Sequence, residues 1–246
     1  MESLELCNNT RQTDTLKSVL SLSGGKTSSF MAVHYPVDYR VFALVQIEEP
    51  KTIPSDKGFL KAIEKKIKKP FVGTPEDIKT LRVVLDLEQL IGEPITWLTG
   101  PTFDELIIAR SALPNKAMRF CTTEMKMYPI FKWWYKTIGE VCKMGVGYRL
   151  DEQERCDVFN EKIKYRAAQN TFGHKRYKWK EVKWRKGWFP LVEEGITRPA
   201  INNFWEDKSL DFPLSSNCQI CFWKSPEELS QNWQENPIIM EWAARK

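Results

Sequence analysis

The sequence lacks the features that would place the chain in a membrane or on a secretory route. No apolar run approaches the length of a transmembrane helix, about 20 residues. The opening residues, MESLELCNNT, have no basic stretch followed by an apolar one, so they do not resemble a signal peptide. There is also no internal repeat and no low-complexity tract. We therefore expect a cytoplasmic protein that makes no contact with membranes.

The composition is that of a globular protein large enough to bury a substantial core. The chain has 246 residues, of which 42% are hydrophobic and 28% are charged. This length suits one α/β domain with elaborations, or one domain and a small appendage. The net charge of +5 is mild, but basic residues concentrate in segment 161–188, where aromatic residues lie among them.

Short apolar runs alternate with helical patterns along the chain. We predict strands at residues 18–22, 39–47, 81–87, 95–98 and 140–148. We predict helices at residues 28–34, 59–68, 102–112 and 128–138. This alternation favours an α/β fold with a doubly wound, mainly parallel sheet. We expect residues 1–160 to form its core, with the basic segment and a small C-terminal cysteine-bearing part, 161–246, packed on it.

The segment SGGKTS (23–28) lies between the first predicted strand and the first predicted helix. A Walker A loop needs another glycine five residues before Gly25, and that position is Leu20. A P-loop NTPase is therefore excluded. Two glycines, a lysine and three hydroxyls at a helix N-terminus still favour phosphate binding over an ordinary glycine-rich turn.

Four further motifs follow this loop along the chain. They are RFCTTEMK (119–126), GYRLDEQER (147–155), GWFPLVEEGITRPAINNFW (187–205) and SNCQICFWK (216–224). Together with SGGKTS, they resemble the PP-loop ATP-pyrophosphatase and phosphoadenosine phosphosulfate reductase superfamily, which has an adenine nucleotide alpha-hydrolase-like fold. The last two motifs are similar to the ends of phage- and bacterium-encoded members. The resemblance spans residues 18 to 225.

The resemblance implies a site for ATP or a related adenine nucleotide, with Mg²⁺. The implied nucleotide-binding residues are Ser23, Gly24, Gly25, Lys26, Thr27, Ser28, Arg119, Lys126, Gly147, Arg149 and Arg155. The implied catalytic residues are Lys26, Arg149, Asp151 and Cys121. Asp151 and Glu152 could orient the arginines, bind Mg²⁺ or contact a ribose hydroxyl. Without the resemblance, residues 147–155 would be interpreted as charged, solvent-exposed residues at the start of a helix.

The cysteine spacing indicates a metal or redox site. Cys218 and Cys221 form a Cys-x-x-Cys pair, which in a reducing compartment suits zinc, an iron–sulfur cluster or a redox couple. The resemblance places Cys121 with this pair and favours a cluster over zinc. Cys156 is a weak candidate for the fourth ligand, and His174 is an alternative. Cys7, near the terminus, and Cys142, within an apolar strand, are poorer candidates.

The resemblance has one departure with a functional consequence. Family members that reduce activated sulfate carry a catalytic cysteine in a C-terminal tail, and no cysteine follows Cys221 here. We therefore favour cleavage of the α–β phosphate linkage coupled to sulfur transfer to an acceptor, with a sulfur- or electron-donor protein as partner. A true sulfonucleotide reductase is the first alternative. A non-catalytic, metal-stapled nucleic-acid-binding protein is the second.

Segment 161–188 permits two interpretations. Its lysines and arginines could contact phosphates while Trp and Tyr stack on bases, which suits a nucleic-acid acceptor. Alternatively, it is an edge hairpin whose aromatics pack on the domain while its lysines face water. The mild net charge favours the hairpin.

Overall fold

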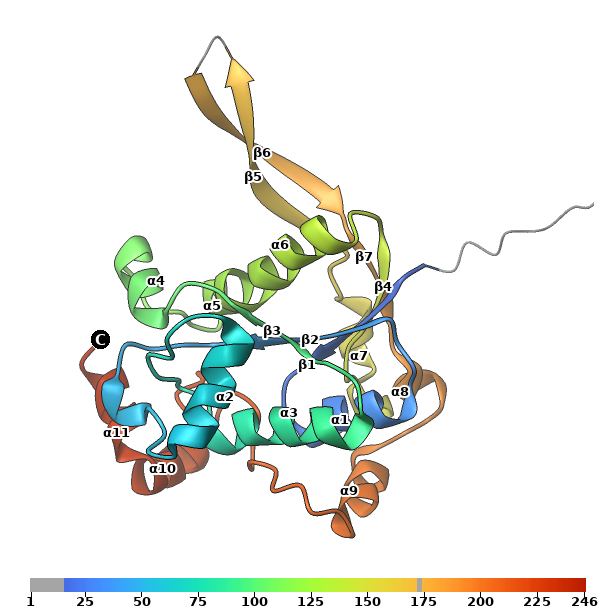
Figure 1. Cartoon of the computed structure of the whole chain (residues 1–246), viewed down its shortest axis with the longest axis vertical. Coiled ribbons are helices and arrows are strands. Elements are labelled where there is room, and N and C mark those ends of the chain that lie inside the picture. Colours follow the sequence, from blue (N-terminus) through green and yellow to red (C-terminus); the bar gives the residue numbers. More distant parts are fainter. Residues whose placement is uncertain (1–15, 172–173) are drawn as a thin grey trace, which may run out of the picture.

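A five-stranded sheet forms the centre of the molecule (Figure 1). The computed structural model describes residues 16–171 and 174–246. The strand order is β3-β2-β1-β4-β7, and all neighbouring strands in this sheet are parallel. The strands are β1 (Ser18–Leu22), β2 (Tyr39–Leu44), β3 (Thr96–Thr99), β4 (Cys142–Gly145) and β7 (Arg185–Trp188). The α/β class and the mainly parallel sheet are confirmed.

Helices cover both faces of this sheet (Figure 1). The lower face in that view is covered by α1 (Lys26–His34), α2 (Lys57–Ile67), α3 (Ile78–Ile91), α8 (Pro190–Glu193) and α9 (Arg198–Glu206). The upper face is covered by α6 (Tyr128–Thr137), which continues a helical run formed by α5 (Phe120–Thr122) and one π-helical turn, η2 (Thr123–Met127). α4 (Phe103–Arg110) lies on the same side.

The strand sequences alternate between the two faces, which is why each face has its own core. In β1, Leu20 packs with the α1–α3 side and Val19 packs with α6. In β2, Phe42 packs with the α1–α3 side and Val41 packs with α6. Each such side chain contributes about 1.5–3 kcal/mol when fully buried. A third cluster, which includes Val45, lies beyond the end of β2.

The strand predicted at 81–87 is wrong, because these residues lie within helix α3. The helix begins at the Asp77 cap, whose carboxylate accepts from the Lys79 amide, and ends at Gly92 with φ +68°. Val83 and Val84 are both buried. The segment LRVVLDL is mostly apolar and contains two adjacent β-branched residues, so it imitates a buried strand.

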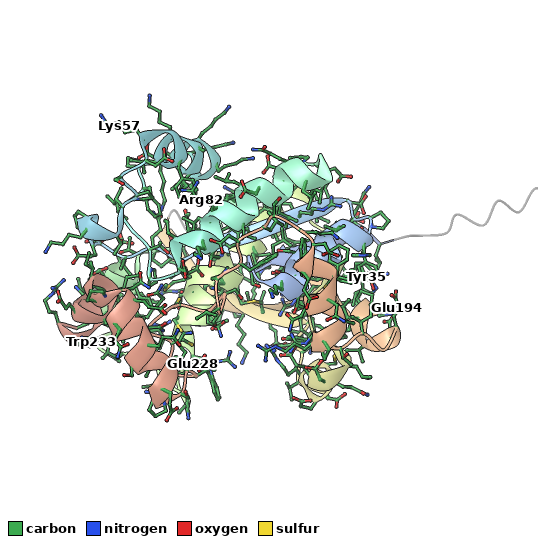
Figure 2. The ribbon with its side chains drawn as sticks, turned by 90° about the horizontal axis from the view of Figure 1, so that it is seen from below. Tyr35, Lys57, Arg82, Glu194, Glu228 and Trp233 are labelled. Atoms are coloured by element: carbon green, nitrogen blue, oxygen red, sulfur yellow. The ribbon has the colours of Figure 1, made fainter. Side chains whose placement is uncertain are left out.

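Residues after 160 share the core of the residues before it. Strand β7 pairs with β4 in the main sheet, and Trp205 of α9 packs in the same cluster as α1. Tyr35 and Glu194 lie side by side in Figure 2, and the Tyr35 hydroxyl donates to the Glu194 carboxylate at 2.7 Å. The chain ends in α10 (Pro226–Glu235) and α11 (Pro237–Ala244), whose Trp242 packs on Phe103.

The remaining elements are short helices and one separate hairpin. The short helices are η1 (Pro50–Thr52), η3 (Leu150–Glu152) and α7 (Glu154–Asp157). Strands β5 (Lys162–Thr171) and β6 (His174–Lys183) form an antiparallel hairpin that projects from the α6 side of the molecule (Figure 1). Within the described ranges, no helix has the length and apolar character needed to cross a membrane.

Candidate functional site

Two predicted motifs meet at the carboxyl edge of the sheet. The loop 23–28 follows β1, and residues 146–151 follow β4. These two strands are neighbours, and the chain runs outward from β1 through β2 on one side and through β4 on the other. In open α/β sheets, such a switch in strand order creates the crevice where ligands bind. We call the pair of loops at this point the switch-point site.

The SGGKTS loop is folded tightly around its own serines. The Ser23 amide donates to Ser28 Oγ at 3.1 Å, and Ser28 Oγ donates to the Gly25 carbonyl at 3.1 Å. No side chain caps α1, and its first turn holds no acidic residue. The first amides of a helix have no intrahelical partner, and the positive end of the helix dipole lies there. The start of α1 therefore suits an anion.

The β4 loop touches the SGGKTS loop directly. The Arg149 Nη1 group donates to Thr27 Oγ1 at 2.9 Å. Gly147 lies so close that a Cβ there would stand 3.1 Å from Thr27 Cγ2 and 3.3 Å from the Ser28 amide nitrogen. A side chain at position 147 would push the two loops apart, so the site needs glycine there.

Arg149 is held in place by carboxylates on its far side. Its Nε donates to Asp151 Oδ1 at 3.1 Å, and its Nη2 lies 3.0 Å from Glu152 Oε2. The hydrogen bond from Arg149 holds the pKa of Asp151 below its usual value. Arg155 donates to Glu152 at 2.5 Å and lies over the Tyr148 ring, so it joins this network through Glu152. These contacts favour the orienting role for Asp151 and Glu152.

Helix α9 supports the loop from another side. Lys26 Nζ donates to Asn202 Oδ1 at 3.2 Å, and the Trp205 indole donates to the Lys26 carbonyl at 3.0 Å. Lys26 therefore rests against α9 and must turn from Asn202 to contact a phosphate in the loop.

Gly24→Ala is expected to destabilise the fold by about 1–2 kcal/mol from backbone strain alone, with an added clash. Gly24 has φ +73°, and a Cβ there would stand 2.5 Å from Thr80 Cγ2 on α3. Gly92→Ala is the matched control, because Gly92 has φ +68° and nothing within 4 Å of the added Cβ. Urea unfolding of both variants measures the difference. Equal losses would show that the packing of Gly24 on α3 is loose.

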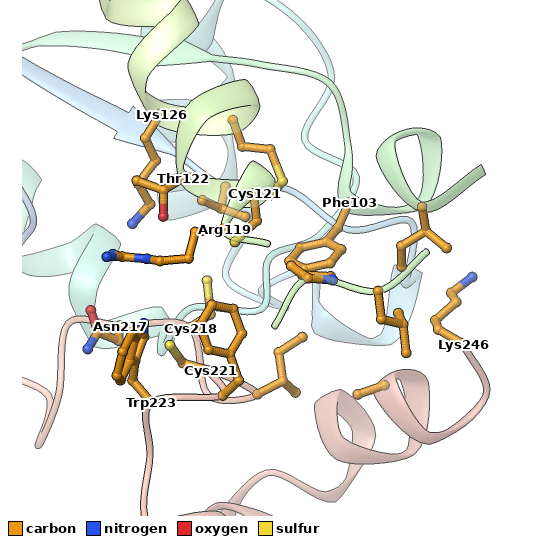
Figure 3. A pocket seen from close by; sticks show the side chains of 18 of the residues that line it. Phe103, Arg119, Cys121, Thr122, Lys126, Asn217, Cys218, Cys221, Trp223 and Lys246 are labelled. Atoms are coloured by element: carbon orange, nitrogen blue, oxygen red, sulfur yellow. The ribbon is translucent and has the colours of Figure 1, made fainter. Parts of the chain in front are cut away.

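A second site, which we call the thiol pocket, lies beyond the end of β2. It is a cavity of about 310 Å³ whose lining includes the side chains of Cys121, Cys218 and Cys221. Figure 3 shows their sulfur atoms pointing into the same space, with Phe103 farther along the cavity. Cys121 comes from α5, and the other two come from the turn before α10.

An ion pair between a half-buried lysine and a buried glutamate adjoins these thiols. Lys126 Nζ lies 3.0 Å from Glu76 Oε1, and the Glu76 side chain is only 1% exposed. Burial raises the pKa of Glu76 although Lys126 opposes the change. Burial alone would lower the pKa of Lys126, but the nearby Glu76 and Cys218 raise it. Burial raises the pKa of Cys218 to about 12, again opposed by Lys126.

The two sites adjoin each other through the segment that carries the thiol pair. Ser216 Oγ donates to Ser23 Oγ at 3.3 Å, and the neighbouring Asn217 already lines the thiol pocket. Figure 3 shows the polar ends of Arg119, Lys126 and Asn217 gathered on one side of that pocket. The predicted nucleotide-binding residues thus divide between the sites: Arg119 and Lys126 line the thiol pocket, whereas the others lie at or beside the switch point.

The other cysteines lie apart from the thiol pocket. Cys156 sits on α7, where its charged neighbours are Glu152, Glu154, Arg155 and Asp157, so its position does not support it as a fourth ligand. Cys142 is fully buried in β4, as expected of a structural thiol. Cys7 and the side chain of His174 lie outside the described residues. Among the residues placed by the structure, no three Cys, His, Asp or Glu side chains are positioned to hold a metal ion together.

Sequence reasoning missed two residues that organise the sites. Ser216 reaches Ser23 across 193 residues, and Glu76 reaches Lys126 across 50 residues. Glu76 belongs to none of the quoted motifs. Ser216 is the first residue of SNCQICFWK, but that motif was interpreted through its cysteines. No local pattern marks a long-range partner of this kind.

Comparison with known proteins adds no relative to this description. No family model matches the chain, and no curated protein gives a significant match. The functional assignment therefore rests on the residues of the two sites.

Proposed function

We propose that the chain is a PP-loop enzyme of the phosphoadenosine phosphosulfate reductase type that binds ATP or a related adenine nucleotide at the switch-point site. The observation that carries this proposal is the contact between Arg149 and Thr27, 2.9 Å, at the point where strand order reverses. It joins two loops whose sequences both suit phosphate. The resemblance of the quoted motifs supplies the choice of adenine nucleotide.

The proposed reaction breaks the bond between the α- and β-phosphates. An acceptor oxygen attacks the α-phosphorus, and pyrophosphate leaves with the bonding electron pair. The loop amides, Lys26 and Arg149 stabilise the negative charge that develops on the leaving pyrophosphate. Asp151 orients Arg149, and because its side chain is also 40% exposed, it would be the carboxylate to hold Mg²⁺ as well.

The second half of the proposal concerns sulfur. A sulfide donor attacks the adenylated carbon of the acceptor and displaces AMP, which leaves with the acceptor oxygen, so that sulfur replaces that oxygen. Cys121 is the proposed sulfur-handling residue, since its pocket adjoins the switch-point site. Cys121, Cys218 and Cys221 would be the ligands of an iron–sulfur cluster, or of zinc, and binding would have to draw their sulfur atoms closer together than they lie among the described residues. Three thiolates facing one pocket repel each other unless they are protonated or bound to a cation, and a bound metal would let all three ionise together.

Product analysis tests the reaction. With ATP and Mg²⁺ alone, water takes the place of the acceptor oxygen at the α-phosphorus, and the proposal predicts AMP and pyrophosphate in equal amounts. ADP and phosphate would contradict it. Sulfite release from a sulfonucleotide would identify a reductase instead, and tight binding without products, even with sulfide and candidate acceptors present, would identify a non-catalytic binding protein.

Metal analysis tests the thiol pocket. Protein purified without oxygen is expected to contain iron and acid-labile sulfide, and Cys218→Ser is expected to lose both. Cys142→Ser is the control, because Cys142 is buried in β4 away from the pocket. Zinc without sulfide would select the alternative metal. Cys156→Ser with unchanged iron would remove Cys156 from the ligand set.

A further inference from the structure

The β5–β6 hairpin is a second candidate surface, remote from both sites in the fold. It forms a two-stranded sheet of its own and projects from the body of the molecule (Figure 1). Among the hairpin side chains that the structure describes, those at the base are packed. Ile163, Tyr165 and Val182 lie against the core cluster that contains Phe131 and Trp184.

The register divides the hairpin into two faces. Ile163 pairs with Val182 and Tyr165 pairs with Lys180, so the face that meets α6 carries these residues. Lys164 pairs with Glu181 and Arg166 pairs with Trp179, which places them on the opposite face. We call this opposite face the outer face. It also carries Lys162, Lys183 and Tyr177.

Two large aromatic side chains on the outer face remain exposed. Tyr177 is 59% exposed and Trp179 is 61% exposed. The Arg166 guanidinium carbon lies 5.4 Å from the Tyr177 ring centre and 5.9 Å from the Trp179 ring centre. The hairpin interpretation was therefore correct about the strands, but the prediction that the aromatics pack on the domain holds only for the base. At the outer face, rings and cations stand together in water.

Most of the charged side chains that the structure describes on the hairpin are basic, and several of them form no ion pair there. Lys162 lies 3.6 Å from Glu181, and Lys183 lies 2.7 Å from Glu161. In the part of the chain that the structure describes, no carboxylate forms an ion pair with Lys164, Arg166, Lys178 or Lys180. These cations are therefore available to a polyanion.

We propose that the outer face of the β5–β6 hairpin binds single-stranded nucleic acid. Bases stack on Trp179 and Tyr177, while Lys164 and Arg166 contact phosphates. Stacking requires unpaired bases, so exposed rings favour a single strand over a duplex. An acidic peptide would match the cations but gives no reason for the exposed rings. This proposal does not depend on nucleotide cleavage, and either can fail alone.

Fluorescence anisotropy with labelled 20-nucleotide single strands of DNA and RNA tests the proposal. We expect binding that weakens with salt, and a loss of about tenfold or more in Trp179→Ala, since stacking contributes about 1–3 kcal/mol per base. Trp233→Ala is the matched control. Trp233 is 48% exposed on α10 (Figure 2), so its removal should leave affinity unchanged. Lys164→Ala should flatten the dependence of affinity on salt.

Several outcomes would overturn the proposal. They are equal affinity in wild type and Trp179→Ala, tighter binding to duplex than to single strands, or binding to anionic vesicles without binding to oligonucleotides. Because Trp179 is exposed, Trp179→Ala should keep the wild-type unfolding midpoint. ATP cleavage assayed without a nucleic acid should also persist in this variant, which separates failure of the hairpin from failure of the switch-point site.

Discussion

Lys126→Met is expected to lower the free energy of unfolding by about 3 kcal/mol near neutral pH, because it leaves a buried carboxylate without its charged partner. The variant leaves the Glu76 carboxylate, which is 1% exposed, without its only cationic partner in the described structure. A second oxygen of the same carboxylate already lacks a hydrogen-bond partner among the described residues. Urea unfolding at constant pH measures the loss.

The loss in Lys126→Met should depend on pH in a defined direction. Burial raises the pKa of folded Glu76 above its unfolded value, and removing Lys126 raises it further. A folded state that holds a proton more tightly is favoured at low pH, so stability falls as pH rises from the unfolded pKa, about 4.3, toward the folded pKa. The variant should therefore be less stable at pH 8 than at pH 5.

The double variant Glu76→Gln with Lys126→Met is the control. It replaces two charges with neutral groups of similar size, so most of the lost stability should return. Its stability should also depend less on pH than that of Lys126→Met. If the double variant is no more stable than Lys126→Met, the broken ion pair does not explain the loss. The loss would then come from disturbed packing around Met125 and η2.

Arg149→Ala is expected to weaken binding of ATP with Mg²⁺ by about 1.5–3 kcal/mol, or roughly 10- to 150-fold. The substitution removes a charge-assisted contact from a side chain that is only 15% exposed and fixed by Asp151. Isothermal titration measures the affinity. Arg149→Lys should recover little, because a lysine cannot contact Asp151 and Thr27 in the same fork.

Arg82→Ala is the matched control for Arg149→Ala. Arg82 lies on α3 over the Phe59 ring, and its side chain is half exposed (Figure 2). Its removal takes away the same charge from the protein without touching the switch-point site. Equal weakening in both variants would mean that net charge, rather than a specific contact, governs binding.

The sequence predicts most of the sheet because β1, β2 and β4 are short apolar segments bounded by turns. It fails at α3, where the apolar and β-branched residues imitate a strand although Arg82 and Asp86 lie on the exposed side of the helix. The switch-point site is predictable for the same reason as the sheet: loops after neighbouring parallel strands meet at one edge. Residue types then suffice to place Thr27 and Arg149 together.

Contacts between segments far apart in the sequence cannot be predicted from local residue patterns. The Ser216–Ser23 bond depends on how the segment after α9 crosses the sheet edge, and the Glu76–Lys126 pair depends on a loop meeting η2. The hairpin shows the same limit. An edge hairpin was one of two interpretations of segment 161–188, but only the position of α6 decides that Tyr165 is covered while Trp179 is exposed.

Hydrogen–deuterium exchange with ATP and Mg²⁺ tests most directly whether the two loops form one nucleotide site. We expect saturating nucleotide to slow exchange in peptides covering residues 23–29 and in peptides covering residues 146–152. Exchange in α2 (Lys57–Ile67), which lies on the outer side of the lower layer, should not change. Protection of one loop without the other, or no protection in either at saturating nucleotide, would contradict the central claim.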